Sequence, residues 1–339
     1  MPDIPADYVK ALAAREAVEH LGDLAGELAA AQNGTVIVPL NDQGLIRASG
    51  PDAADFLHNL LTNDIKNLAA DGVRLAGLCT PKGRLLATFL VWREGEDLVL
   101  QLAADLAEAI LKKLSMYVLR SKVVLSDAGN DQRQLGLAGH EASEALRRLG
   151  MPVPEPMKTA PFRDGLVIAL APDRFILAVA GTAAEALGKS LAENAKPAGV
   201  AAWRWLEIAA GQPRIVAATQ EAFVPQMVNM ELPAVAGVSF HKGCYPGQEI
   251  VARTQYLGKV KRRMYRARMD EAFPPGTDVF TPEAGDQHCG ALATVAPSPE
   301  GGYECLVVVQ SSGAEAGEIH VGAPQGPRLS LQPQPYPLD

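Results

Sequence analysis

Hydrophobic residues recur along the chain with two different periods, which predict a mixture of helices and strands. Residues 7–31 repeat leucine and valine at helical spacing, which predicts one or two amphipathic helices with a break near Gly22 or Gly26. Residues 35–50 alternate like two strands around a polar turn, and this pattern predicts a hairpin. A second hairpin is predicted over residues 75–92. Further expected elements in this half are helices at 51–61 and 105–117 and a strand at 98–102.

The second half of the chain carries two different patterns. Residues 129–197 alternate strand, helix, two strands and helix, which is typical of a small ferredoxin-like domain. Residues 203–208 are apolar enough for either a strand or a helix. After residue 258, short strands separated by proline and glycine turns predict a small antiparallel β-barrel or jelly roll. The chain therefore belongs to the α+β class.

Composition narrows the class of protein. A chain of 339 residues with 48% hydrophobic residues is expected to fold into two or three domains. Its net charge of −8 argues against a broad nucleic-acid surface and against a basic face for membranes. The first residues are acidic and no apolar run reaches membrane-spanning length, so we expect a cytoplasmic protein without membrane association.

The four cysteines do not form a C-x-x-C pair, and four in a chain of this length do not make a disulfide framework. Cys289 and Cys305 lie close to His288 in the barrel segment, but a zinc site needs further ligands that the sequence lacks. We therefore predict no resident metal ion.

Cys244 stands in the segment K-G-C-Y-P-G-Q-E, residues 242–249. Pro246 and Gly247 suit the central positions of a type II turn, and a helix is expected from Gln248 onward. A thiol just before a helix N-terminus, with Lys242 nearby, is in surroundings that favour the thiolate. The alternative at this point is that Cys244 is a small buried hydrophobe.

This segment resembles the signature of the YgfZ folate-binding family, relatives of the glycine-cleavage T protein that include iron–sulfur assembly factors. Further blocks match in order, and together they cover roughly residues 35 to 335. These blocks are residues 45–65, 80–87, 117–123 and 223–263.

The resemblance implies a three-domain T-protein-like ring with a central opening for tetrahydrofolate. It also implies a role in iron–sulfur cluster assembly or repair, which indirectly supports cluster enzymes such as those that thiomethylate tRNA. The implied parts are an N-terminal helical extension (1–32), a folate-binding domain (33–128 plus 198–257), a ferredoxin-like domain (129–197) and a C-terminal β-barrel (258–339).

On this resemblance Cys244 is the central residue, as a redox-active thiol or transient cluster ligand, and Lys242 supports it. Gly243 and Gly247 permit the turn, while Gln248 and Glu249 either orient the loop or serve only the helix start. Arg120 and Lys122 either meet a folate glutamate tail or are ordinary solvated cations. The residues expected to contact folate are Glu207, Arg120, Lys122, Tyr245, Gln248, Glu249 and Arg253.

Three positions depart from the family pattern. T proteins carry a catalytic carboxylate where residues 86–88 hold no acid, so aminomethyl transfer is not expected. Many relatives have glutamate where this chain has Ala209; Glu207 replaces it if the segment is a strand, but points elsewhere in a helix. Gln43 stands where some relatives carry a tryptophan.

Three functions therefore remain: a folate-dependent accessory factor, a folate-dependent one-carbon transferase or demethylase, and a structural docking adaptor. The first is preferred, as a protein that is not a conventional enzyme. The cations Lys259, Lys261, Arg262 and Arg263 lack interleaved aromatic residues, so they predict a solvated strand edge and no direct nucleic-acid partner.

Overall fold

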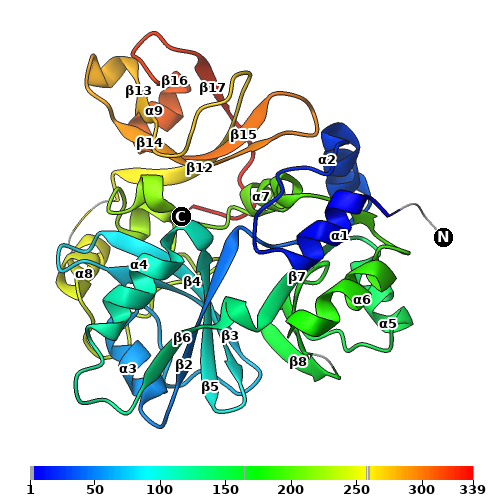
Figure 1. Ribbon diagram of the computed structural model, residues 1–339. Helices are drawn as coiled ribbons and strands as arrows, with labels where there is room; N and C mark the ends of the chain where they lie inside the picture. Colours follow the sequence, from blue (N-terminus) through cyan, green and yellow to red (C-terminus); the bar gives the residue numbers. More distant parts are fainter. Residues whose placement is uncertain (1–3, 164, 257, 259, 339) are drawn as a thin grey trace. The chain divides into compact units, whose positions relative to one another are not determined.

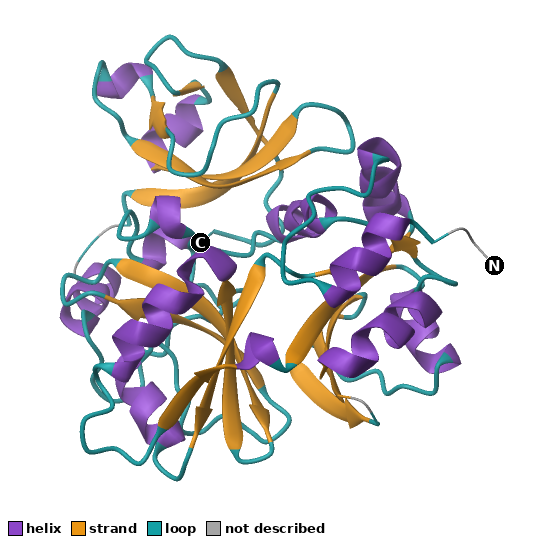
Figure 2. Cartoon of the chain, in the orientation of Figure 1, coloured by secondary structure: helices purple, strands orange, loops and turns teal. Residues whose placement is uncertain are grey.

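The computed structural model describes residues 4–163, 165–256, 258 and 260–338. The chain divides into two compact units, each built from several segments (Figure 1). The first unit contains residues 1–53, 68–74 and 90–203, and the second contains residues 54–67, 75–89 and 204–339. Both mix helices with strands, as the α+β prediction requires (Figure 2).

A six-stranded sheet in the order β11-β1-β7-β10-β9-β8 forms one part of the first unit. Helices α1, α5 and α6 contribute Leu12, Leu146 and Leu191 to the buried core that covers it. The sequence β7-α5-β9-β10-α6-β11 follows the predicted ferredoxin-like pattern, with β1 inserted between β11 and β7 and with β8 added at the edge. The bounds are β1 Thr35–Pro39, β7 Gln132–Gly139, β8 Lys158–Phe162, β9 Gly165–Ala171, β10 Arg174–Ala180, β11 Lys196–Pro197, α1 Ala6–Ala13, α5 Ala142–Arg148 and α6 Gly181–Leu191.

The predicted hairpin over residues 35–50 is wrong, because its two strands join different sheets. Strand β1 pairs with β7 and β11, whereas β2 (Gln43–Ser49) pairs with β5 and β6. All five residues of β1 are buried, so this strand needs a sheet that is covered on both faces. Local alternation reveals that a strand forms, but not which strand it pairs with. The domain boundaries inferred from the sequence stay predictions.

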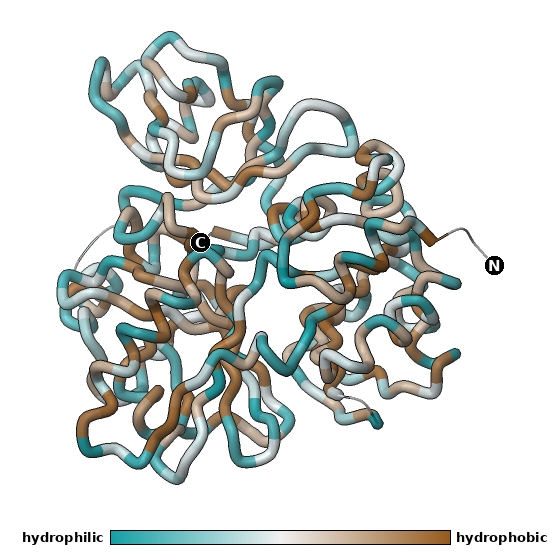
Figure 3. The backbone as a smooth tube through the Cα atoms, in the orientation of Figure 1, coloured by the Kyte–Doolittle hydropathy of each residue, from teal (hydrophilic) through white to brown (hydrophobic). Residues whose placement is uncertain are grey.

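A five-stranded sheet in the order β3-β4-β5-β2-β6 contains the predicted second hairpin, β3 and β4. Helix α4 packs on β2, where Gly44 lies so close to the helix that a Cβ would come within 2.6 Å of Ala107 Cβ. The inner strands carry mainly hydrophobic residues, which are coloured brown in Figure 3. The bounds are β3 Val73–Cys79, β4 Leu85–Glu94, β5 Asp97–Ala103, β6 Val124–Asp127 and α4 Ala104–Ser115.

The C-terminal part of the second unit is a closed antiparallel barrel, which confirms the prediction for this segment. Its strands close in the order β12-β15-β14-β13-β16-β17. Cys289 and Cys305 point into its apolar core, where they are 1% and 0% exposed. The bounds are β12 Arg262–Met269, β13 Asp278–Phe280, β14 Gly290–Pro297, β15 Tyr303–Gln310, β16 Ile319–Val321, β17 Arg328–Leu331 and α9 Ser311–Ala316.

The remaining helices frame the candidate site or lie near the N-terminus. The predicted helical region 7–31 forms two helices, and Gly22, with φ +102°, lies in the break between them. Residues 203–208, whose sequence suits a strand or a helix, are helical. No described helix combines the length and apolarity that crossing a bilayer takes. The bounds are α2 Leu24–Asn33, α3 Ala53–Leu60, α7 Val200–Ala209 and α8 Gln248–Tyr256.

Candidate functional site

Cys244 lies in the turn that precedes α8, as the sequence predicts. The Gln248 amide donates to the Tyr245 carbonyl at 3.1 Å, and Gly247 has φ +82°, which together fit a type II turn. Cys244 is exposed, whereas the other three cysteines are buried. The interpretation of Cys244 as a buried hydrophobe is therefore wrong.

The turn is fixed by close contact with the turn between β3 and β4, within the second unit. A Cβ on Gly247 would lie 2.5 Å from the Thr80 carbonyl oxygen and 2.7 Å from Gly83 Cα. Gly83 itself has φ +72° and lies against the Ile250 side chain. Two glycines thus let the two turns approach more closely than any side chain permits.

Gly243 is different, because neither its backbone nor its packing requires glycine. Its φ lies outside the left-handed region, and the nearest atom to a Cβ there would be His58 Nε2 at 4.0 Å. The space beside Gly243 is therefore open, and its nearest neighbour is the His58 imidazole.

Lys242 holds the start of the turn against the end of α3. Its Nζ donates to the Leu61 carbonyl at 2.6 Å and also to the His58 carbonyl. Carbonyls at a helix C-terminus lack partners within the helix, so a lysine there completes the helix. Nζ also lies 5.0 Å from the centre of the Tyr245 ring. Burial lowers the pKa of Lys242 to about 8, while the negative charges of Asp64 and Cys244 oppose this shift.

His58 is a neighbour of the turn that the sequence analysis did not identify. Its Nδ1 lies 3.1 Å from Asp64 Oδ1, and the Lys66 amide donates to the same nitrogen at 3.4 Å. Burial, and then the positive charge of Lys242, lower the pKa of His58, while Asp64 opposes them. A histidine 184 positions before Lys242 gives no local signal of this proximity, although an aspartate six residues after it is visible in the sequence.

The other residues assigned around the turn differ in exposure. Tyr245 is 6% exposed, and burial raises the pKa of its hydroxyl. Gln248 is half-buried, while Glu249 and Arg253 are exposed on α8. Arg120 and Lys122 are exposed in the first unit, in the loop between α4 and β6.

The strand-based argument for Glu207 is wrong, because its segment is helix α7. Two residues along a helix turn the side chain by roughly 200°, so Glu207 does not share the face of Ala209. The Glu207 carboxylate is instead buried and lies 3.3 Å from the Arg214 guanidinium. At the position of the missing T-protein acid, the Thr88 hydroxyl accepts the Ile215 amide at 3.1 Å.

The basic segment 259–263 is only partly described, since Lys259 lies outside the described residues. Lys261 is exposed, and Arg263 pairs with Glu231 at 2.7 Å. Throughout the described ranges, no three His, Cys, Asp or Glu residues gather closely enough to hold a metal ion.

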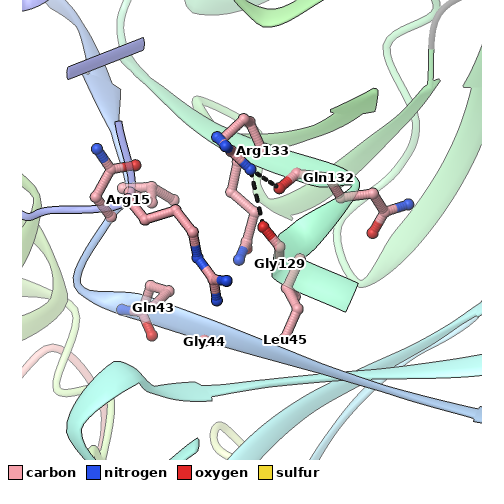
Figure 4. A pocket seen from close by; sticks show the side chains of 10 residues that line it. Arg15, Gln43, Gly44, Leu45, Gly129, Gln132 and Arg133 are labelled. Atoms are coloured by element: carbon pink, nitrogen blue, oxygen red, sulfur yellow. Dashed lines mark hydrogen bonds between the residues drawn. The ribbon is translucent and has the colours of Figure 1, made fainter. Parts of the chain in front are cut away.

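A separate pocket, open to solvent, lies within the first unit (Figure 4). The Arg15 guanidinium extends into it between Gln43 and Gly129. Arg133 closes one side, where it donates to the Gly129 carbonyl at 2.8 Å and to the Gln132 carbonyl at 2.9 Å. The lining is completed by Leu40, Asn41, Gly44, Leu45 and Gln134. The pocket is thus rich in carboxamide and guanidinium groups.

Comparison with known proteins gives the T-protein-like fold and the family that the sequence resembles. Residues 3–162 match the GCVT N-terminal domain. The solved glycine cleavage system aminomethyltransferase T from Bartonella henselae shares the fold, with a TM-score of 0.76, 19% identity, and coverage of 92% of this chain and 89% of that chain. The tRNA-modifying protein YgfZ of Sodalis glossinidius is 30% identical over 89% of this chain and 93% of its own length. That of Edwardsiella ictaluri is 31% identical over 92% and 96%, respectively. With this identity along nearly its whole length, the chain belongs to the YgfZ family.

Proposed function

We propose that this protein is a folate-binding accessory factor that supports tRNA modification by serving iron–sulfur enzymes, with Cys244 as the acting group. The observation that carries the proposal is an exposed thiol on a turn that two glycines and a half-buried lysine hold in place. Its relatives are named tRNA-modifying proteins, and its fold is shared with an aminomethyltransferase.

The pocket of the first unit is the proposed contact site for the polar edge of the folate pterin, because its lining is rich in carboxamide and guanidinium groups. The Asn41 amide nitrogen already donates to the Ala11 and Glu16 carbonyls, whereas the buried Gln132 Oε1 has no hydrogen-bond partner among the described residues and can accept from the edge of a pterin. Bound tetrahydrofolate would supply a reduced pterin that can carry a one-carbon unit. Exposed Arg120 and Lys122 are available to the carboxylates of its tail.

One-carbon transfer is the less favoured function, because the groups that would handle protons are missing or occupied. Residues 86–88 hold no acid, and the Glu207 carboxylate pairs with Arg214. An assay for formaldehyde or methylene-folate with methylamine donors tests this alternative, and steady turnover would favour it over the accessory role.

The test of the proposal uses cells that depend on this protein for thiomethylated tRNA. Cys244→Ser is expected to abolish the modified nucleoside, as quantified by mass spectrometry of digested tRNA. Cys305→Ala, which removes a thiol from the barrel core, is the matched control and is expected to retain it. Full modification with Cys244→Ser would exclude the acting role of this thiol and favour a docking adaptor.

Folate binding is tested separately by calorimetry with tetrahydrofolate on the full chain. Gln43→Ala in the pocket is expected to weaken binding about tenfold, the cost of one or two hydrogen bonds. Gln32→Ala, an exposed glutamine on α2, is the control. Binding that is unchanged by Gln43→Ala would place folate elsewhere, and no binding at all would refute the folate role.

A further inference from the structure

The loop that joins α4 to β6 exposes an unusual amount of apolar side chain. Within residues 116–124, Met116 is 62% exposed, Leu119 89% and Val124 68%, while Tyr117 is 43% exposed. These are four of the eight large hydrophobic residues that are exposed in the described chain. A cluster of this kind on a protein surface commonly marks an interaction site. We call residues 116–124 the apolar–basic loop.

The apolar–basic loop is held in place by hydrogen bonds and is therefore a shaped surface. The Lys122 amide donates to Asp52 Oδ2 at 2.7 Å, and the Ser121 amide donates to the Val118 carbonyl at 2.8 Å. Gly50 approaches so closely that a Cβ there would lie 2.3 Å from the Lys122 carbonyl oxygen. The backbone of the loop is thus already ordered, which lowers the entropy cost of binding a partner.

Leu119 is the tip of this surface and adopts a conformation that leucine avoids. Its φ is +42°, a left-handed conformation in which the Cβ of a non-glycine residue crowds the backbone. The most exposed large hydrophobic side chain of the described chain therefore also carries backbone strain. Neither feature helps the isolated protein, since no apolar burial compensates for the strain.

The charges of the apolar–basic loop select the kind of partner. Arg120 and Lys122 are exposed, and Lys112 and Lys113 stand in the last turn of α4. Within the described parts of the chain, none of these four cations forms an ion pair in our structure. A second copy of this chain would bring like charges together if the loops met each other, which disfavours self-pairing.

Strand β6 adds a backbone component to the same surface. It is the last strand in the sheet order, so within the described residues its outer edge has no strand partner. It begins at Val124, the last residue of the apolar–basic loop. An open strand edge beside apolar side chains is the arrangement that accepts an extended segment of another protein.

We propose that the apolar–basic loop and the edge of β6 dock an extended acidic, apolar segment of a partner protein, which pairs with β6. Carboxylates of the segment meet Arg120 and Lys122, and its apolar side chains cover Leu119 and Val124. RNA is disfavoured because the exposed apolar groups are mainly aliphatic and do not stack on bases. A lipid surface cannot use the backbone groups of the strand edge.

The probe is a fluorescent ten-residue peptide that alternates valine with glutamate, and its counterpart replaces glutamate with lysine. Anisotropy titrations of the full chain are expected to show binding of the acidic peptide only. Leu119→Ser and the double variant Arg120→Glu/Lys122→Glu are each expected to weaken it about tenfold or more. Leu149→Ser, an exposed leucine outside the loop, is the matched control and is expected to bind normally.

Several outcomes would overturn the proposal. These are equal binding of both peptides, binding that Leu119→Ser leaves unchanged, and no binding of either peptide. Displacement by polyglutamyl tetrahydrofolate would assign the cations to the folate tail instead. Preferential binding of bulk tRNA or of phosphatidylglycerol vesicles through the same residues would assign the loop to those partners. Normal Cys244 labelling and tetrahydrofolate binding in Leu119→Ser show that the variant is folded, so a negative result with the peptides leaves the proposed function untouched.

Discussion

The two glycines that flank Cys244-Tyr245-Pro246 provide a direct test of how the cysteine turn is built. Gly247→Ala places a methyl group 2.5 Å from the Thr80 carbonyl oxygen and 2.7 Å from Gly83 Cα, both backbone atoms that cannot rotate away. Gly243→Ala adds the same methyl group one residue before Cys244, where the nearest atom is 4.0 Å away. Both variants replace glycine with alanine, so the difference between their free energies of unfolding reflects only the backbone conformation and the neighbouring atoms at each position.

The expected magnitudes follow from φ and from these contacts. At φ +82°, alanine costs about 1–2 kcal/mol in backbone energy, and forcing the two turns apart costs about 1–3 kcal/mol more. The stiffer unfolded chain returns roughly 0.4–1 kcal/mol. We therefore expect Gly247→Ala to lower the free energy of unfolding by about 2–4 kcal/mol. Gly243→Ala is expected to leave it unchanged or to raise it by up to about 1 kcal/mol.

Scanning calorimetry and urea denaturation measure both variants against the wild type. A loss of about 2–4 kcal/mol corresponds to a fall in Tm of roughly 5–15 °C for a cooperative unit of this size. The labelling rate of Cys244 by iodoacetamide is expected to rise in Gly247→Ala, as the turn loosens. Equal stability of the two variants would refute the idea that Gly247 is required for the close approach of the two turns.

Three further predictions concern single groups of the second unit. Ellman's reagent at pH 8 is expected to titrate one thiol rapidly, that of Cys244, and the buried thiols only after unfolding; rapid reaction of a second thiol would contradict the burial of the others. The burial-lowered pKa of Lys242 means that its folded form loses a proton more easily than its unfolded form, so stability rises as pH increases from about 8 to 10.5. That rise should be missing in Lys242→Met, and a rise that persists in this variant belongs to another group. Glu304→Ala removes a buried carboxylate that lies 2.6 Å from the Arg266 guanidinium and accepts from the Trp205 indole at 2.9 Å, and urea denaturation should show a loss of about 3–5 kcal/mol. Glu304→Gln keeps a hydrogen-bond acceptor and should lose less, and an equal loss would assign the whole effect to the charge.

The resemblance of the sequence to a known family identified the fold more securely than local patterns did. The spacing of proline and glycine predicts the barrel strands after residue 258, because these residues mark the strand ends locally. It does not predict their pairing, since β12 pairs with β15 and β17 rather than with its neighbour in sequence. The hairpin over residues 35–50 failed for the same reason. Strand β1 takes its partners about 100 or more positions further along the chain, and nothing local encodes that choice.

The features of the cysteine turn can also be separated into those set by local sequence and those set by tertiary contacts. The sequence by itself determined the type II turn and the start of α8, because proline, glycine and helix-start chemistry act within a few residues. Only the tertiary structure decided that Lys242 binds the end of α3, that His58 borders Gly243, and that Glu207 belongs to a buried ion pair. These three contacts depend on which distant segments of the chain pack together. The burial that results from this packing sets the protonation of the side chains and their exposure to solvent.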